Sequence, residues 1–195
     1  MIVLIVIVVL IVAVGAFIWL TYNRLVALRL ACENSWSQID VALKLRHDLI
    51  PTLVAAVAGY AGHEAQTLTQ VTELRSDAVG ADSAGPAQRG TTEARLGGSL
   101  NRMLLLAEDY PELRATENFQ KLQTELSDVE EKISITRRVY NDTVETYNTK
   151  IQVFPSVLIA NAGGFERREF FEAGAGAEIA PTVSLPGPGA GDPTT

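Results

Sequence analysis

The first twenty residues contain no charged and no strongly polar side chain. The apolar run from Ile2 to Leu20 is 19 residues long, close to the ~20 that a helix rising ~1.5 Å per residue needs to cross ~30 Å of hydrocarbon. We therefore predict a transmembrane anchor over residues 1–22. The alternative is a cleaved signal peptide. Such a peptide carries basic residues before a shorter apolar core and a small-residue cleavage site after it. Here no Lys or Arg precedes the apolar run, the run is longer, and no such site follows it.

Beyond the anchor, apolar residues recur at alternating spacings of three and four, which is typical of helices that pack against other helices. Breaks at Pro and Gly divide this pattern into four predicted helices, at about 23–47, 50–79, 91–109 and 112–153. The last pattern is the most regular and runs from Phe119 to Phe154. No strand is needed. The predicted fold class is all-α: an N-terminal transmembrane helix that continues into an up-and-down antiparallel four-helix bundle with coiled-coil-like packing over residues 23–172.

The first break depends on Pro51. No Gly or Pro stands between Phe17 and His47, so the anchor and the first helix are predicted to form one helix. Pro51 lacks an N–H, disfavours helical geometry at Ile50 and suits the first turn of a new helix, so we predict that one helix ends near His47 and another begins with Asp48 as its N-cap. If Pro51 only kinks one long helix, the domain would have three helices and the last would run in the opposite direction.

With four antiparallel helices the last one returns to the membrane, which brings residues 154–171 beside the bilayer. Residues 165–171 combine three aromatic side chains with two arginines. They either pack across the end of the bundle or lie among the lipid headgroups, and the candidate membrane-surface residues are Phe165, Arg167, Arg168, Phe170 and Phe171. Residues 173–195 are rich in Gly, Ala and Pro and are expected to form a flexible tail.

The distribution of charged residues predicts how the chain is oriented in the membrane. Arg24 and Arg29 follow the span, and basic residues near a span are held in the cytoplasm, so we predict a single-pass cell-membrane protein with its N-terminus outside and its bundle in the cytoplasm. Eight acids and two bases lie between residues 108 and 131, at the predicted far tip, away from the anionic inner leaflet. The net charge of −7 argues against nucleic acid as a partner.

The sequence carries almost no pattern that is typical of a catalytic site. The only cysteine, Cys32, excludes an intramolecular disulfide and a Cys-based zinc site, and it is expected to be a buried small residue rather than a lipidation site. His47 and His63 form no metal-binding pattern, and we expect surface or capping roles for them. No enzyme activity, metal or cofactor is predicted.

Polar residues on the last predicted helix are more informative. Tyr-Asn occurs three times in the chain, and two copies, Tyr140-Asn141 and Tyr147-Asn148, stand one heptad apart. Repeated on one helical face, they are candidates for a buried polar layer that fixes helix register. The alternative is a small ligand-binding site built from the same four side chains.

An ordered set of short motifs along the chain resembles the LemA family of bacterial membrane proteins. The motifs include Glu33-x-x-Trp36-Ser-Gln-Ile-Asp40, Asp48-Leu-Ile-Pro51, Leu106-Ala-Glu-Asp-Tyr-Pro111, Arg138-x-Tyr-Asn141 with Tyr147-Asn148, and Phe154-Pro with Gly164-Phe165 and Phe170-Phe-Glu172. The resemblance implies a single-span anchor carrying an up-and-down four-helix bundle. It implies no enzyme activity, since the family has no established biochemical function, and some relatives are associated with membrane remodelling or surface-peptide presentation.

These features predict a membrane-anchored, non-enzymatic interaction or scaffold protein. We expect it to contact membrane lipid and either to self-associate as a homo-oligomer or to hold an unidentified membrane protein partner at the membrane surface. The alternative function is a membrane-tethered sensor or ligand-binding bundle that uses the Tyr-Asn layer.

Overall fold

The computed structural model describes residues 1–61 and 63–172. In these residues the helices are α1 (Ile2–Ala58), α2 (Ala65–Gly80), α3 (Pro86–Ala107), α4 (Pro111–Arg114), α5 (Glu117–Gln152) and α6 (Ser156–Ala162). The described ranges contain no strand, which confirms the predicted all-α class. The predicted flexible tail, residues 173–195, lies outside them.

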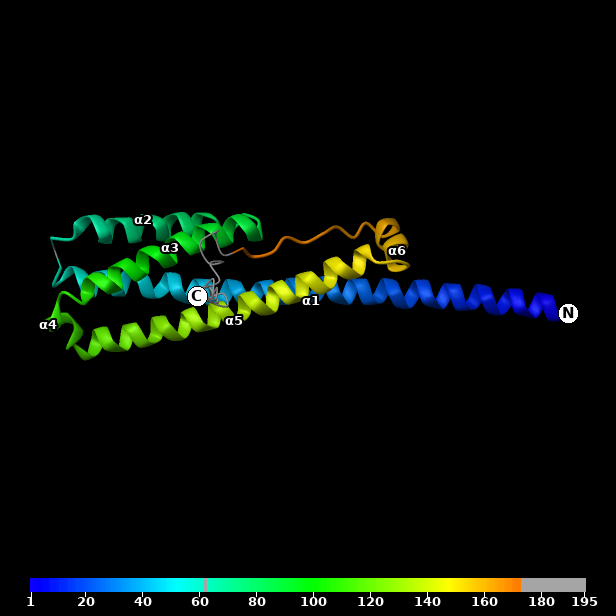
Figure 1. Cartoon of the computed structure of the whole chain (residues 1–195), viewed down its shortest axis with the longest axis horizontal. Coiled ribbons are helices and arrows are strands. Elements are labelled where there is room, and N and C mark those ends of the chain that lie inside the picture. Colours follow the sequence, from blue (N-terminus) through cyan, green and yellow to red (C-terminus); the bar gives the residue numbers. More distant parts are fainter. Residues whose placement is uncertain (62, 173–195) are drawn as a thin grey trace, which may run out of the picture.

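One long helix, α1, joins the apolar stretch to the helical body. It is 57 residues long, and it is the one described helix that is long and apolar enough to cross a membrane. Its residues 2–20 are exposed throughout and project beyond the body (Figure 1). The predicted continuation of the apolar stretch into the first helix is confirmed, and this stretch is a candidate membrane span.

The prediction that a helix ends near His47 is wrong, because α1 runs through Pro51 to Ala58. Pro51 has no N–H to donate to the His47 carbonyl four residues earlier. That carbonyl instead accepts a hydrogen bond of 2.7 Å from Arg75 Nε of α2. The chain turns later, at residues 59–64, so four long helices remain although Pro51 ends none of them.

The other helix ends also differ from the predicted ones. The second long helix covers 65–80 rather than 50–79, and the third begins at Pro86, five residues before the predicted start. Proline suits the first turn of α3, where its missing N–H has no helical partner. The predicted helix 112–153 is divided into α4 and α5. Thr116 is the N-cap of α5, and its hydroxyl accepts a hydrogen bond from the Phe119 N–H.

The four long helices run in alternating directions (Figure 1). α5 packs along α1, while α2 packs on α3 and on the end of α1. The core has two parts. The far cluster contains side chains from all four long helices and from α4, and the near cluster, closer to the apolar stretch, contains side chains of α1, α5 and α6 together with Phe165 and Phe171.

Candidate functional site

The near half of the body is built differently from the far half. There α1 and α5 continue beyond α2 and α3 (Figure 1). Their shared face is covered by α6 and by residues 164–172, which lie outside any helix and which we call the C-terminal segment. Gly164 has a φ of 66°, a backbone conformation that favours glycine, and it redirects the chain from α6 into this segment.

The two Tyr-Asn pairs of α5 bind the backbone of the C-terminal segment. The hydroxyls of Tyr147 and Tyr140 donate to the carbonyls of residues 166 and 169, at 2.9 and 2.8 Å. Asn148 both donates to the Arg168 carbonyl and accepts from its N–H, at 2.8 and 2.9 Å. Asn141 makes the same pair of bonds with Phe171, at 3.2 and 2.9 Å.

The spacing of these contacts follows from the geometry of helix and extended chain. One heptad of α5 rises about 10.5 Å, at ~1.5 Å per residue. Three residues of extended chain span about 10 Å, at ~3.3 Å per residue. A step of seven residues on α5 therefore matches a step of three residues on the segment. Each asparagine side chain makes the pair of backbone hydrogen bonds that a neighbouring strand would make in a β-sheet. The hydrogen bonds go to the backbone, so they carry little preference for the segment's side chains.

Two phenylalanines fix the segment at its ends. Phe165 is buried and lies edge-on to Tyr22 of α1, with ring centroids 5.5 Å apart. Phe171 is buried and lies 5.9 Å from the ring of Trp36. Of the residues predicted as a membrane-surface segment, these two pack against the helices, while Phe170, Arg167 and Arg168 are exposed. The two candidate sets from the sequence, the Tyr-Asn layer and residues 165–171, are thus partners of each other.

Burial changes the chemistry of the tyrosines. It raises the pKa of Tyr140 to about 12, and it also raises the pKa of Tyr147. Both phenols therefore stay protonated in the neutral range and keep donating to the segment. Burial likewise raises the pKa of the Cys32 thiol, and the side chain is buried as predicted.

A buried polar layer separates the two parts of the core. Arg46 of α1 contacts the Glu93 carboxylate of α3 and donates to Glu130 of α5 at 3.0 Å. His47 Nε2 lies 2.9 Å from the other oxygen of Glu93. Arg75 of α2 binds the His47 carbonyl, so the layer connects all four long helices.

The expectation that His47 has a surface or capping role is wrong, because its side chain is buried. It is held inside because α1 does not end there. Burial by itself would raise the pKa of Glu93, but the hydrogen bond from His47 and the charge of Arg46 outweigh it, so the pKa lies below its ordinary value. His63 is exposed at the turn after α1.

The part that Arg46, Glu93 and Glu130 play in this layer was not predicted from the sequence. A signal was present for the first two, because continuing the spacing of three and four beyond Leu43 reaches Arg46, and running it back from Leu96 reaches Glu93. The partners are 46 or more positions apart in the chain, so the sequence alone does not show which of these charged residues pair in the fold.

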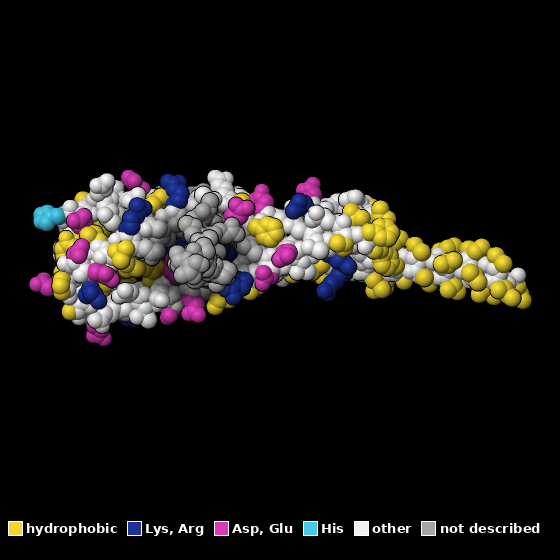
Figure 2. All heavy atoms as spheres, viewed as in Figure 1, with side chains coloured by type: hydrophobic (Ala, Val, Ile, Leu, Met, Phe, Trp, Pro, Cys, Tyr) yellow, Lys and Arg dark blue, Asp and Glu magenta, His cyan; other side chains and the backbone are white. Residues whose placement is uncertain are grey.

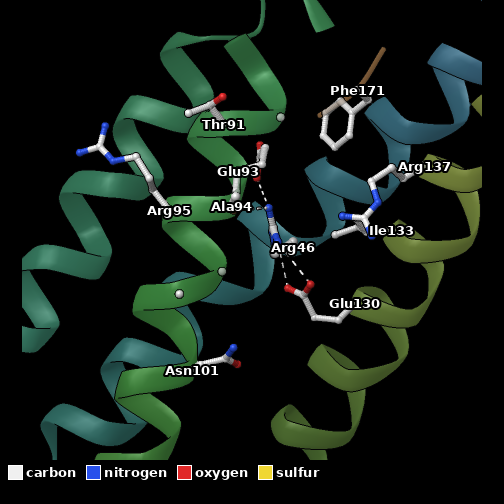
Figure 3. A pocket seen from close by; sticks show the side chains of 13 residues that line it. Arg46, Thr91, Glu93, Ala94, Arg95, Asn101, Glu130, Ile133, Arg137 and Phe171 are labelled. Atoms are coloured by element: carbon white, nitrogen blue, oxygen red, sulfur yellow. Dashed lines mark hydrogen bonds and ion pairs between the residues drawn. The ribbon is translucent and has the colours of Figure 1, made fainter. Parts of the chain in front are cut away.

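A cavity of about 620 Å³ opens beside this layer between α3 and α5 (Figure 3). Arg46 lies at its base between Glu93 and Glu130, and Phe171 of the C-terminal segment borders it. Gly90, Gly97 and Gly98 of α3 also line it. The described residues contain no group of His, Cys, Asp and Glu side chains arranged to hold a metal ion.

Comparisons with known proteins give relatives over most of the chain. The sequence model of the LemA family matches residues 35–185. Magnetosome protein MamQ 2 of Paramagnetospirillum magneticum is 24% identical, over 83% of this chain and 68% of the relative. Magnetosome protein MamQ of Magnetospirillum gryphiswaldense is 25% identical, over 77% and 64%. Protein LemA of Metamycoplasma hominis is 29% identical, over 66% and 58%.

Proposed function

This chain belongs to the LemA family, and we propose that it is a membrane-anchored, non-enzymatic scaffold that holds extended polypeptide segments in the groove between α1 and α5. The observation that carries the proposal is the double Tyr-Asn contact with a peptide backbone. Backbone recognition in register is how extended peptides are bound with tolerance for their side chains. In this structure the groove holds the chain's own C-terminal segment.

The arrangement in the membrane is part of the proposal. α1, α2, α3 and α5 form an up-and-down antiparallel four-helix bundle, and the far cluster supports this because it draws side chains from all four. The span holds the bundle at the cell membrane, with the N-terminus outside and the bundle in the cytoplasm. The magnetosome name of two relatives is in keeping with work at a membrane surface.

Self-association follows if the C-terminal segments of two copies exchange. The Arg168 side chain lies 2.7 Å from that of Glu33 on α1, and both are partly exposed. In a Cys32→Ala background, Glu33→Cys is placed on one tagged copy and Arg168→Cys on another, and both are expressed in the same membrane. Arg168 and Glu33 meet only at the ends of two long side chains, which is too far for cysteines to bond directly, so a short bifunctional thiol crosslinker is added. Exchange predicts a crosslinked pair carrying both tags.

The control carries both substitutions on one copy, where an intrachain crosslink is expected without exchange. Intrachain bonds in the control combined with no mixed-tag pair would contradict self-association through this segment. A different membrane protein would then be the occupant to seek.

The competing proposal is a sensor in which a small ligand binds to Tyr140 and Tyr147. Both hydroxyls are already bonded to the C-terminal segment, so a ligand would have to displace it. Tyr147→Phe would then abolish ligand-dependent stabilisation without lowering the basal stability. A loss of basal stability would instead support the scaffold, since the carbonyl of residue 166 would lose its donor.

A further inference from the structure

The turn between α5 and α6, together with the first turn of α6, exposes apolar side chains at the end of the body nearest the span; we call this region the α5–α6 turn. Val153 is 42% exposed, Phe154 80% and Leu158 63%. Other exposed apolar residues of the body, such as Leu105 at 62%, lie elsewhere on its surface. Figure 2 shows hydrophobic side chains gathered where the body meets the projecting helix. An exposed apolar patch of this kind is typical of a surface that contacts a membrane or another protein.

The level of this turn along α1 follows from the helix pairing. The rings of Trp36 on α1 and Tyr140 on α5 lie 5.2 Å apart, and the two helices run in opposite directions. Phe154 is 14 residues beyond Tyr140, and Tyr22 is 14 residues before Trp36. Because both helices rise ~1.5 Å per residue, Phe154 lies at about the level of Tyr22. The contact of Phe165 with Tyr22 places the end of α6 there as well.

That level coincides with the edge of the membrane. Residues 2–20 span about 28 Å at ~1.5 Å per residue, close to the ~30 Å thickness of the hydrocarbon. Tyr22 lies two residues past Leu20, about 3 Å further along the helix axis. α1 is unbroken from Ile2 to Ala58, so the height of the turn above the bilayer is fixed by the helix itself.

We infer that Val153, Phe154 and Leu158 insert into the interfacial layer of the bilayer that holds the span. Headgroup levels favour amphipathic and aromatic side chains, and Trp19, 67% exposed on the span, has the position of an interfacial anchor. The turn is therefore a second membrane contact. It fixes the tilt of the body, and so the direction in which the groove between α1 and α5 faces. This inference rests on the proposed membrane anchoring.

The test uses the full chain in phosphatidylcholine vesicles. Leu158→Cys, in a Cys32→Ala background, is labelled with an environment-sensitive fluorophore, and quenching by spin-labelled lipid is measured. Val12→Cys in the span and Leu105→Cys on α3 are the controls. We expect quenching at position 158 to be at least about twofold stronger than at 105, as for an interfacial group, and the emission to shift to shorter wavelength.

Each other outcome has a distinct meaning. Quenching at position 12 with none at 158 or 105 would overturn the second contact while leaving the anchor intact. No quenching at any of the three would contradict the anchor itself. A blue-shifted but unquenched label at 158 would show that protein covers the turn, as in contact with a second copy, and would also overturn the inference.

Discussion

Glu93 is the residue on which the buried layer depends. Its carboxylate contacts both Arg46 and His47, and only 3% of its side chain is exposed. Removing one partner of a buried ion pair leaves an uncompensated charge, which commonly costs more than the pair contributes. The layer therefore stabilises the fold only while all of its members are present.

We predict that Glu93→Gln lowers the free energy of unfolding by about 3 kcal/mol at neutral pH, because Arg46 stays buried with less compensation. The folded-state pKa of Glu93 lies below its ordinary value of 4.5. This stabilisation is therefore complete above about pH 4.5 and is lost as the pH falls through the folded-state pKa. Urea unfolding in detergent micelles across this range measures it. Glu131→Gln, an exposed control on α5, should change stability by less than ~0.5 kcal/mol.

Asn148 offers a test of the backbone ladder by a change of a single atom. Asn148→Asp keeps the acceptor for the Arg168 N–H but turns the donor into an oxygen that faces the Arg168 carbonyl. We predict faster hydrogen exchange in residues 164–172, with α1 and α5 protected as before. Asn101→Asp, at an exposed position of α3, is the matched control. Equal exchange in the two variants would contradict the role of the ladder.

The sequence predicted the four Tyr-Asn side chains but not their partner. A heptad spacing reports that side chains share a helical face, and this was visible for Tyr140 and Tyr147. The C-terminal segment shows no alternating apolar pattern in the sequence, because its partner is a helix and not a strand. Its match to α5 becomes visible only when the length of seven helical residues is compared with the length of three extended residues.

At the scale of elements, Pro51 shows why a local rule failed. Proline removes one helical hydrogen bond, and the rule that it ends a helix assumes that nothing replaces that bond. Here the replacement donor is Arg75, which lies 28 residues after His47, whose carbonyl accepts the bond. No local pattern contains that contact, so the sequence could predict the number of long helices but not the end of the first.

We predict that Arg75→Met destabilises the protein by about 1–2 kcal/mol, since the buried carbonyl of His47 loses its donor. Pro51→Ala restores a backbone N–H at the position that normally serves this carbonyl. In the Pro51→Ala background, Arg75→Met should therefore cost clearly less. Thermal unfolding of the four proteins in a double-mutant cycle measures the coupling. Additive effects would mean that the arginine does not replace the missing bond.

Two glycines of α3 provide a matched pair for the position of the C-terminal segment. A Cβ on Gly90 would overlap the Glu172 carbonyl oxygen and lie 3.0 Å from the Glu172 nitrogen, while a Cβ on Gly98 meets nothing within 4 Å. We predict that Gly90→Ala displaces the end of the segment and makes residues 164–172 more sensitive to protease. Gly98→Ala should stabilise α3 by ~0.5–1 kcal/mol without that effect. Equal protease sensitivity in both would place the segment elsewhere.

At the scale of the whole molecule, the lengths of the helices determine the design. α1 and α5 have 57 and 36 residues, whereas α2 and α3 have only 16 and 22. The difference leaves a face of α1 and α5 that the C-terminal segment and α6 cover. The long apolar helix at the N-terminus, the all-α class and the number of long helices could be predicted from the apolar pattern. The division of the core into two clusters was not, because it depends on unequal helix lengths and on charges paired across helices.

The charges around the candidate span predict an orientation for the molecule. Arg24 and Arg29 follow the span, and basic flanks are generally held in the cytoplasm. We predict that Glu112→Cys, exposed at the far end of the body, reacts with a membrane-impermeant maleimide only after cells are permeabilised, in a Cys32→Ala background. A cysteine added before Met1 should react in intact cells. The reverse pattern would place the body outside, and the two arginines would then be outweighed by a signal beyond the span.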